Sequence, residues 1–416
     1  MRLVLACFVV LATLTLQAQD PLHIPVKDTD TSLKQGPVFL PWPSPEYWRQ
    51  DSLSGIADQS LPADTVPMLM RETALTDSML WSHLSQDDAF ETVPLTIIGT
   101  GDIMLGTSYP SGNYLPAGED CSPILRPVQH ILRSGDLLFG NMEGVFCSTG
   151  GTPKTCRDLN NCYVFRMPDH FLTCFLEAGY NVLSVANNHV NDFGPTGRAS
   201  TAAMLDSAGV AFAGFVTHPW TLFEKDGVIY GFAAFAPNQG TMDLKDYRRA
   251  AEITALLDSI ADVVIISFHG GGEGQDHQHV VKGDEYYLGE NRGNVVRFAH
   301  TVVDAGADIV FGHGPHVTRA MELYGDRLIC YSLGNFATYG RFNLRGPNGI
   351  APIVKVTVDM DGRFLGGEVV SVYQTGEGGP RVDSSGRAAL KIKELSDSDF
   401  PDQELVVEID GTLWKR

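Results

Sequence analysis

The feature that most constrains the fold is an alternation of short apolar runs and helical patterns between residues 93 and 336. Runs rich in β-branched and aromatic residues predict strands at residues 95–101, 137–144, 181–186, 210–215, 228–235, 263–268, 309–312 and 328–333. Apolar residues at helical spacing predict helices at residues 124–132, 170–178, 196–207, 250–260 and 292–304. Apolar strands need cover on their faces, so the alternation predicts an α/β fold with helices packed on its sheets.

The pattern changes after Ile350. Residues 350–373 resemble a β-meander, and Asp361-Gly362 is a dipeptide typical of a hairpin turn. This segment adds sheet-on-sheet character to the predicted α/β fold. We therefore expect one domain over residues 93–375, followed by a C-terminal extension over residues 376–416.

The first 92 residues have a different composition. The apolar run Leu3–Leu16 is too short to span a bilayer comfortably and leads into a polar chain, so residues 1–19 are interpreted as a cleaved secretory signal. Residues 20–92 are rich in proline, which predicts an irregular extension with one helix at Met68–Leu84. The expected location is the periplasmic or extracellular face of the cell envelope, without a membrane span once the signal is removed. A retained N-terminal anchor is the alternative.

The chain is strongly acidic. It carries 30 Lys and Arg against 50 Asp and Glu, a formal net charge of −20. Such a surface repels phosphate backbones and anionic lipids, which argues against nucleic acid as a ligand. An acidic protein can still bind a polyanion when metal ions supply positive charge locally, so an anionic substrate stays open.

Six cysteines follow Cys7. In an oxidising compartment, the four in the polar stretch between residues 121 and 162 predict one or two loop-stapling disulfides among Cys121, Cys147, Cys156 and Cys162. Cys174 and Cys330 lie in apolar patterns and are predicted to be buried free thiols. A zinc site is the alternative for the four loop cysteines, but there is no CxxC pair to support it.

Polar side chains cluster directly after apolar strands, where open α/β sheets place their ligands. Each alone has an ordinary interpretation, because an Asp after Gly can form an Asx turn and a His in a Gly-rich loop can be exposed. Their joint occurrence at successive strand ends predicts one common site. Its members are Asp102, Asn141, Glu143, Asn187, Asn188, His189, Asp192, His269, His313 and His316.

These residue types suit divalent metal ions. Carboxylate oxygen and imidazole nitrogen match Mn²⁺, Zn²⁺ or Fe²⁺, whereas Mg²⁺ prefers oxygen alone. Two such ions about 3.5–4 Å apart can clamp a phosphoryl or carbonyl oxygen and activate water near neutral pH. We therefore expect divalent ions, two in number, drawn from Mn, Zn, Fe and Mg. His130, His170 and His300 lie within helical patterns and are expected to be structural.

At these residues the chain resembles the CapA-like (poly-γ-glutamate capsule synthesis) family of the calcineurin-like metallophosphatase superfamily. The resemblance covers roughly residues 93–373 and meets the family motifs in order: Gly101-Asp102-Ile103-Met104-Leu105, Gly140-Asn141-Met142-Glu143, Ala186-Asn187-Asn188-His189 with Asp192 and Gly194, His269 with Glu273, Gly312-His313 with Pro315-His316-Val317, and Tyr331-Ser332-Leu333-Gly334-Asn335-Phe336. It implies a metallophosphatase-like sandwich of two β-sheets flanked by helices, with a metal site at the loop edge.

The resemblance also implies roles for single residues. His189 would stabilise or protonate the leaving group as general acid, Asp192 would orient a neighbour, and Glu273 would complete the catalytic set. The implied metal ligands are Asp102, Glu143, Asn188, His269, His313 and His316.

Two of the family motifs depart from the usual pattern. Ordinary phosphatases of this superfamily carry His two residues after the first Asp, where this chain has Met104, so one ligand is missing. The usual His-Trp-Gly is His269-Gly270-Gly271 here, and the Tyr after the Glu is Gly274. Without the Trp and the Tyr, this part of the pocket is expected to be open.

The leading hypothesis is an exported, metal-dependent hydrolase that acts on an anionic surface polymer, such as poly-γ-glutamate, or on its precursor. The alternative is a non-catalytic factor that binds the polymer and envelope assembly proteins during assembly or export. A weaker alternative is a carbohydrate-active module that uses the paired carboxylates Glu143 and Glu273. The excess of His over acids at the strand ends argues against this last possibility.

Overall fold

The computed structural model describes residues 38–39, 93–156 and 162–416. The expected signal at residues 1–19, almost all of the Pro-rich extension and the helix expected at Met68–Leu84 lie outside the described residues. Among the described residues, no helix combines the length and the apolar character needed to cross a membrane.

The first of two large sheets has seven strands. Its central strands are parallel to one another, and hairpin partners add antiparallel strands at its edges. Their order is β1 (Val38–Phe39), β8 (Trp220–Lys225), β9 (Val228–Phe235), β10 (Val263–His269), β13 (Ile309–His313), β15 (Arg327–Cys330) and β14 (Met321–Tyr324).

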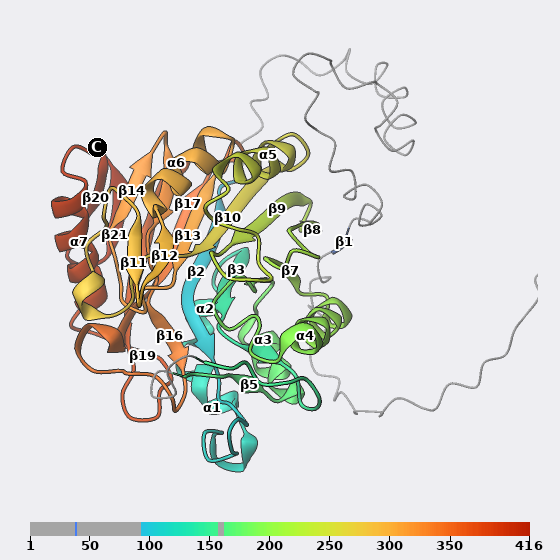
Figure 1. Cartoon of the computed structure of the whole chain (residues 1–416). Helices are drawn as coiled ribbons and strands as arrows, with labels where there is room; N and C mark the ends of the chain where they lie inside the picture. Colours follow the sequence, from blue (N-terminus) through green and yellow to red (C-terminus); the bar gives the residue numbers. More distant parts are fainter. Residues whose placement is uncertain (1–37, 40–92, 157–161) are drawn as a thin grey trace, which may run out of the picture. The chain divides into compact units, whose positions relative to one another are not determined.

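The described residues form a second sheet of ten strands. Figure 1 shows its strands β2, β3, β17 and β21. Strands β2, β3, β6 and β7 run parallel, whereas β17 and β18 form the antiparallel meander. The order is β20 (Leu405–Val407), β21 (Thr412–Lys415), β18 (Phe364–Tyr373), β17 (Ile350–Val358), β2 (Leu95–Met104), β3 (Leu137–Met142), β6 (Val182–Ser184) and β7 (Ala211–Ala213), with β16 (Asn335–Thr338) on β2 and β19 (Arg381–Val382) on β18.

The two sheets pack face to face around one apolar core. Alternate residues of a strand point to opposite faces, so Ile97 of β2 joins the core between the sheets while Ile98 joins the core beneath the helices. At the centre of the sandwich, Phe139 stacks on Phe311 of the opposite sheet at 4.8 Å between ring centroids. Because both faces are buried, the strands read as continuous apolar runs, as the sequence predicted.

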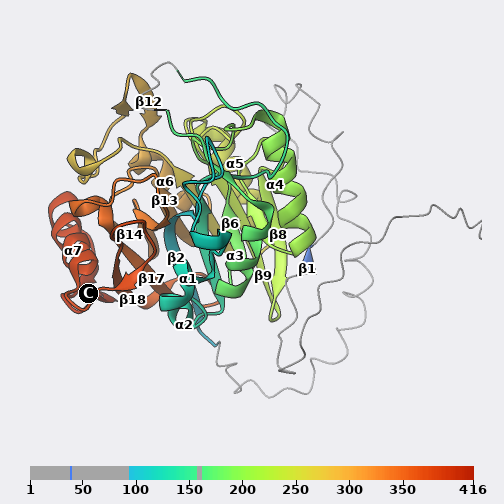
Figure 2. The ribbon, with the colours of Figure 1, turned by 90° about the horizontal axis from the view of Figure 1, so that it is seen from below.

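Helices cover the outer faces of both sheets (Figures 1 and 2). Residues of α5 (Tyr247–Asp258) and α6 (Val295–Asp304) pack on the seven-stranded sheet, and α1 (Ser122–Leu125), α3 (Leu172–Ala178) and α4 (Gly194–Ala208) pack on the ten-stranded sheet. The C-terminal helix α7 (Arg387–Asp399) contributes residues to the core between the two sheets. It also contributes to the core between the seven-stranded sheet and its covering helices. The expected α/β sandwich is confirmed.

The remaining short elements lie in the connections. They are η5 (Ala117–Glu119), η6 (Arg126–Val128), α2 (Gln129–Leu132), β4 (Val145–Phe146), β5 (Arg166–Met167), η8 (Asp169–Phe171), η9 (Gln275–His277), β11 (Glu285–Tyr287), β12 (Glu290–Gly293) and η10 (Gly346–Gly349).

Two predicted helices differ from the observed ones for local reasons. The helix expected at residues 124–132 is broken into α1, η6 and α2, since Pro127 cannot donate a helical hydrogen bond. The helix expected from Arg292 begins at Val295, because Asn294 caps it by accepting a hydrogen bond from the Arg297 amide at 2.9 Å. Arg292 itself belongs to β12.

The disulfide prediction was partly wrong. Cys156 and Cys162 are bonded as expected, but Cys121 is bonded to Cys174, which was predicted to be a free thiol. Cys174 lies on α3 directly beside α1, with its Cα 6.1 Å from that of Cys121. The apolar pattern around Cys174 therefore indicated correctly that the residue is buried, but it did not indicate that its thiol is free. Cys147 and Cys330 are buried free thiols.

Candidate metal centre

Strand ends from both sheets converge on the predicted site. In the ten-stranded sheet, Asp102 of β2 is directly opposite Asn141 of β3. In the seven-stranded sheet, the last residues of β10 and β13, His269 and His313, are paired with each other. Neighbouring parallel strands bring their carboxyl ends to the same edge of a sheet. Polar residues that follow such strands in the sequence therefore lie side by side within each sheet.

Asp102 is at the centre of one half of the site. Its side chain is 1 % exposed, and its Oδ2 lies 2.8 Å from Nδ1 of His316. Its Oδ1 lies 3.3 Å from Nδ1 of His313 and accepts a hydrogen bond from Nδ2 of Asn141 at 2.8 Å. Asp102 thus connects β2 to two imidazoles, that of His313 at the end of β13 and that of His316 in the loop that follows.

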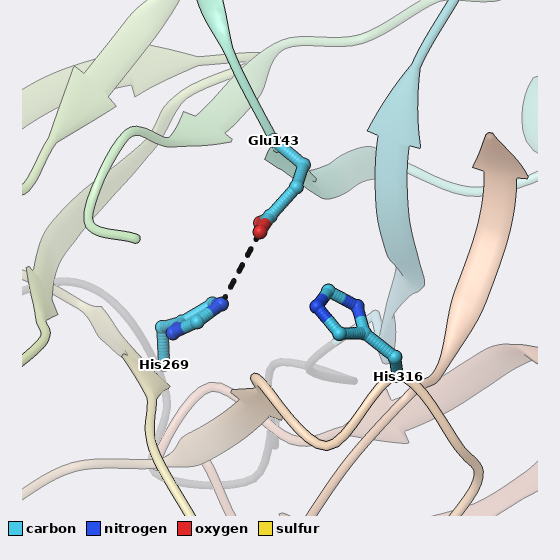
Figure 3. A group of neighbouring side chains, drawn as sticks. All are labelled: Glu143, His269 and His316. Atoms are coloured by element: carbon cyan, nitrogen blue, oxygen red, sulfur yellow. Dashed lines mark ion pairs between the residues drawn. The ribbon is translucent and has the colours of Figure 1, made fainter. Parts of the chain in front are cut away.

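Glu143 organises the other half. Its Oε1 lies 3.4 Å from Nε2 of His269, which Figure 3 shows pointing at the carboxylate, and 3.8 Å from Nε2 of His189. One ligand atom from each of Glu143, His269 and His316 lies within 4.8 Å of the others, a group that could hold a metal ion. Asn141 joins the two halves, since it also donates to Oε2 of Glu143 at 2.6 Å.

His189 is held in one orientation at the side of this centre. Its Nδ1 lies 2.7 Å from Oδ2 of Asp192, which leaves Nε2 directed toward Glu143. The ring stacks on Phe165 at 4.2 Å, and the His189 amide donates to Oδ1 of Asn187. Asp192 therefore lies where it can fix the orientation of the His189 ring.

Several buried polar atoms of the centre have no hydrogen-bond partner within the part of the chain that the structure describes. They are Oε1 of Glu143, Oδ1 of Asn188 and both ring nitrogens of His269 and of His313. Buried polar groups are normally satisfied, so a group of orphaned donors and acceptors at one place indicates a missing ligand. Imidazole and carboxylate atoms with free lone pairs fit a divalent transition metal ion.

The electrostatics of the centre have clear causes. Burial alone would raise the pKa of Asp102, but the imidazoles of His313 and His316 hold it well below its ordinary value. Burial alone would lower the pKa of His316, but the hydrogen bond to Asp102 and the charges of nearby carboxylates raise it to about 10. Burial alone would raise the pKa of Glu143, but the charge of His269, the hydrogen bond to His269 and the charge of His189 together lower it. The carboxylates are therefore ionised and ready to bind cations.

Two further predicted site residues, Asn188 and Glu273, have partners outside the Asp102 and Glu143 groups. Asn188 offers the buried Oδ1 noted above, while its backbone oxygen accepts a hydrogen bond from Nζ of Lys154 at 3.3 Å. Glu273 forms an ion pair with Arg292 at 3.0 Å and lines a neighbouring cavity of about 510 Å³. That cavity is also lined by Asn348, whose Nδ2 donates to the His316 backbone oxygen at 3.3 Å.

The expectation of an open pocket beside His269 was only half right. A Cβ on Gly270, where the family carries Trp, would lie 2.9 Å from the backbone oxygen of Arg292 and 2.9 Å from Cδ2 of Leu244. The missing Trp therefore leaves no space at Gly270. A Cβ on Gly274 would meet nothing within 4 Å, and this residue does line the cavity.

The structure adds residues that the sequence analysis did not identify. Arg319 is fully buried and forms a two-pronged ion pair with Glu285, at 2.9 and 2.7 Å. It also donates to the backbone oxygens of Gly272 and His277, which fixes the loop after β10. Lys154 forms an ion pair with Asp192 at 2.5 Å. Neither residue follows a predicted strand, so no local signal marked it.

The fold and the site together define a two-sheet α/β sandwich protein with a candidate divalent-metal centre at its strand ends. Residues 96–339 match the family described as bacterial capsule synthesis protein PGA_cap, and the chain belongs to that family. The family predicted from the motifs is confirmed.

Two curated relatives carry related names. The chain is 26% identical over 267 residues to the capsule biosynthesis protein CapA of Bacillus anthracis, covering 59% of this chain and 60% of the relative. It is 26% identical over 279 residues to the PGA biosynthesis protein CapA of Bacillus subtilis, covering 62% and 68%. The match thus spans about three fifths of the length of the first of these relatives.

Two solved structures give weaker similarity. A 5'-nucleotidase precursor from Thermus thermophilus has a TM-score of 0.36 at 14% identity, covering 73% of this chain and 59% of that chain. The purple acid phosphatase PPD1 from yellow lupin also has a TM-score of 0.36, at 11% identity, covering 70% of this chain and 54% of that chain.

Proposed function

We propose that the protein is an exported, divalent-metal-dependent hydrolase acting on an anionic surface polymer of the poly-γ-glutamate type, or on its precursor. The observation that carries this proposal is the convergence of buried His and carboxylate side chains, from both sheets, with unpartnered ligand atoms. Membership of a capsule synthesis family supports the polymer as the biological context. A location outside the cytoplasm rests on the N-terminal sequence.

In the proposed reaction, the residues of the centre would have three separate roles: binding metal ions, donating a proton and orienting the proton donor. Divalent ions held by these residues would supply Lewis-acid polarisation of the scissile group and a water of lowered pKa. His189 would give a proton from Nε2 to the leaving group, and Asp192 on Nδ1 keeps that nitrogen turned toward the centre. The metal ions would be held by Asp102, Glu143, Asn188, His269, His313 and His316.

The cavity beside the centre, although lined by the carboxylates Glu273 and Asp276, offers one cation to an anionic substrate. Its lining includes Arg345, which is exposed and forms no ion pair with any residue in the described part of the chain. A guanidinium binds carboxylate or phosphate with two parallel hydrogen bonds. On a chain with a net charge of −20, such a free cation next to the centre would offset the repulsion of an anionic polymer.

The second candidate function is a non-catalytic factor that binds the polymer during assembly. One relative, from Mycobacterium tuberculosis and 30% identical over 181 residues, is named a probable polyglutamine synthesis accessory protein. The match covers 37% of this chain and 44% of that relative. In this alternative the cavity and Arg345 would act without turnover.

The experiment that separates these functions combines metal analysis with activity. The purified protein is analysed for bound metal and assayed with Mn²⁺ on a p-nitrophenyl phosphodiester and on poly-γ-glutamate. We expect His189→Ala and Asp102→Asn to lower kcat at least 100-fold, since removing a general acid alone costs about 10²–10⁴-fold. The matched control is His130→Ala on α2, an exposed histidine outside the centre.

The outcomes are distinct. Activity equal to wild type in both His189→Ala and Asp102→Asn would refute the catalytic assignment. A protein that binds poly-γ-glutamate, keeps its stability after chelation and shows no turnover with any of the metals would be the non-catalytic factor.

A further inference from the structure

A disulfide lies between two residues that touch the His189–Asp192 pair. Cys156 and Cys162 are bonded, with Lys154 two residues before the first and Phe165 three residues after the second. All four residues are described, and the disulfide is one of two in the described part of the chain.

Lys154 contacts Asp192 at two points and Asn188 at a third. Its Nζ lies 2.5 Å from Oδ1 of Asp192, and its amide donates to the Asp192 backbone oxygen at 2.9 Å. Its Nζ also donates to the backbone oxygen of Asn188. The Asp192 side chain is fully buried, whereas the Lys154 side chain is 26 % exposed. The Lys154 ammonium therefore contacts Asp192 and Asn188 from the side that faces solvent.

Phe165 holds the same pair from the other end. Its amide donates to Oδ2 of Asp192 at 2.5 Å, the oxygen that also accepts from Nδ1 of His189. Its ring stacks on the His189 imidazole at 4.2 Å and 27°, and Phe342 stacks on it at 5.1 Å. Both carboxylate oxygens of Asp192 and the face of His189 are thus set by residues on either side of one disulfide.

We propose that Lys154 and Phe165 are positioning residues for His189, and that the Cys156–Cys162 disulfide keeps them in place. This rests on the proposed function, in which His189 serves the reaction. The disulfide links the chain two residues after Lys154 to the chain three residues before Phe165, and these two residues contact the two carboxylate oxygens of Asp192. Groups that orient a functional histidine typically change activity 10–100-fold when removed.

The first test measures kinetics in the full-length metal-loaded protein. Lys154→Met should lower kcat about 10-fold with KM within about twofold, because the substrate contacts are unchanged while His189 loses its fixed orientation. Lys154→Arg should recover most of kcat, since a guanidinium can still reach Asp192. A folded Lys154→Met protein, verified by circular dichroism and thermal melting, is required for the comparison.

The two disulfides provide a matched pair of variants. Cys156→Ala/Cys162→Ala should lower kcat about 10-fold. Cys121→Ala/Cys174→Ala removes a disulfide between α1 and α3, neither of which carries a residue of the centre, and should leave kcat unchanged.

The second readout does not depend on catalysis. The Nδ1 proton of His189, hydrogen-bonded to Asp192, should give a downfield resonance in proton NMR that His189→Ala removes. This resonance should be lost or broadened in Lys154→Met and in Cys156→Ala/Cys162→Ala and retained in Cys121→Ala/Cys174→Ala. It therefore tests the positioning even if the wild-type protein hydrolyses nothing, which would refute the proposed function only.

Retention of both kcat and the His189 resonance in Lys154→Met would overturn the role of Lys154. Retention of both in Cys156→Ala/Cys162→Ala would overturn the role of the disulfide. A loss of kcat in Lys154→Met that Lys154→Arg does not recover, with the resonance intact, would also count against positioning.

Discussion

Replacing Cys121 and Cys174 by alanine removes a cross-link that closes a long stretch of chain. The two residues are separated by 53 positions, and their Cα atoms lie 6.1 Å apart on α1 and α3. Both are buried, in the core that packs these helices against the ten-stranded sheet. The second disulfide, Cys156–Cys162, closes only six positions and offers a direct comparison.

The magnitude follows from loop entropy. For a separation of 53, cross-linking removes denatured-state entropy worth about 4 kcal/mol at 25 °C, and for a separation of 6 about 2 kcal/mol. Since domains are typically stable by about 5–15 kcal/mol, loss of the long cross-link removes a large share of the total. We therefore expect the double variant at Cys121 and Cys174 to be the less stable of the two.

The assay is urea denaturation of wild type and both double variants, followed by tryptophan fluorescence. We expect the free energy of unfolding to fall roughly twice as much for the long cross-link as for the short one. The effects on kcat should have the opposite order, because only removal of the short cross-link is expected to lower kcat. Equal losses, or a larger loss for the short cross-link, would refute the entropic argument.

Three further outcomes are expected. Burial raises the pKa of Asp308 to about 6 despite Arg327, so the folded state binds this proton more tightly than the unfolded state does. The free energy of unfolding should therefore fall by on the order of 2–3 kcal/mol as the pH rises from about 4 to about 7. A denaturation series over the same pH range should lack this decrease in Asp308→Asn. Gly101→Ala should lower stability by about 1–3 kcal/mol in urea titrations and weaken metal binding in calorimetry, because its Cβ would lie 2.0 Å from the Gly334 oxygen, next to Asp102. Mn²⁺ or Zn²⁺ at 100 times its Kd should raise the free energy of unfolding by about 2.7 kcal/mol in wild type, measured by thermal shift, and much less in His269→Ala.

Each of these has a control. A denaturation series for Asp308→Asn that keeps the wild-type slope would show that other groups produce it. Gly283→Ala, where an added Cβ would lie 3.9 Å from Val281 and the backbone is not left-handed, should leave metal binding unchanged and separates crowding from the general effect of replacing glycine. An equal metal-induced shift in wild type and His269→Ala would place the ion elsewhere, and His130→Ala should behave as wild type.

Much of the sandwich followed from local patterns. Strands such as β9 and β10 are buried on both faces and therefore read as unbroken apolar runs that any compact fold must cover. The antiparallel strands β8 and β14 were missed, because they are paired through hairpins and carry polar residues such as Glu224 and Glu322. Only their partners in the sheet make them strands.

The candidate centre was predictable for a related reason. Asp102, Glu143, His269 and His313 each stand at or next to the end of a parallel strand, and parallel strands of one sheet deliver their ends to one edge. The sequence by itself therefore determined which side chains would meet within each sheet. Sheet packing then brought the two sets together, across an interface that no local pattern describes.

Tertiary structure alone decided the groups that hold the centre in shape. The partner of Cys121, the contact of Lys154 with Asp192 and the burial of Arg319 against Glu285 all join residues far apart in the chain. Such pairings depend on which surfaces face each other after folding. Residue type and periodicity encode what a segment forms and which face it buries, whereas the identity of the neighbour is set by the packing of the whole domain.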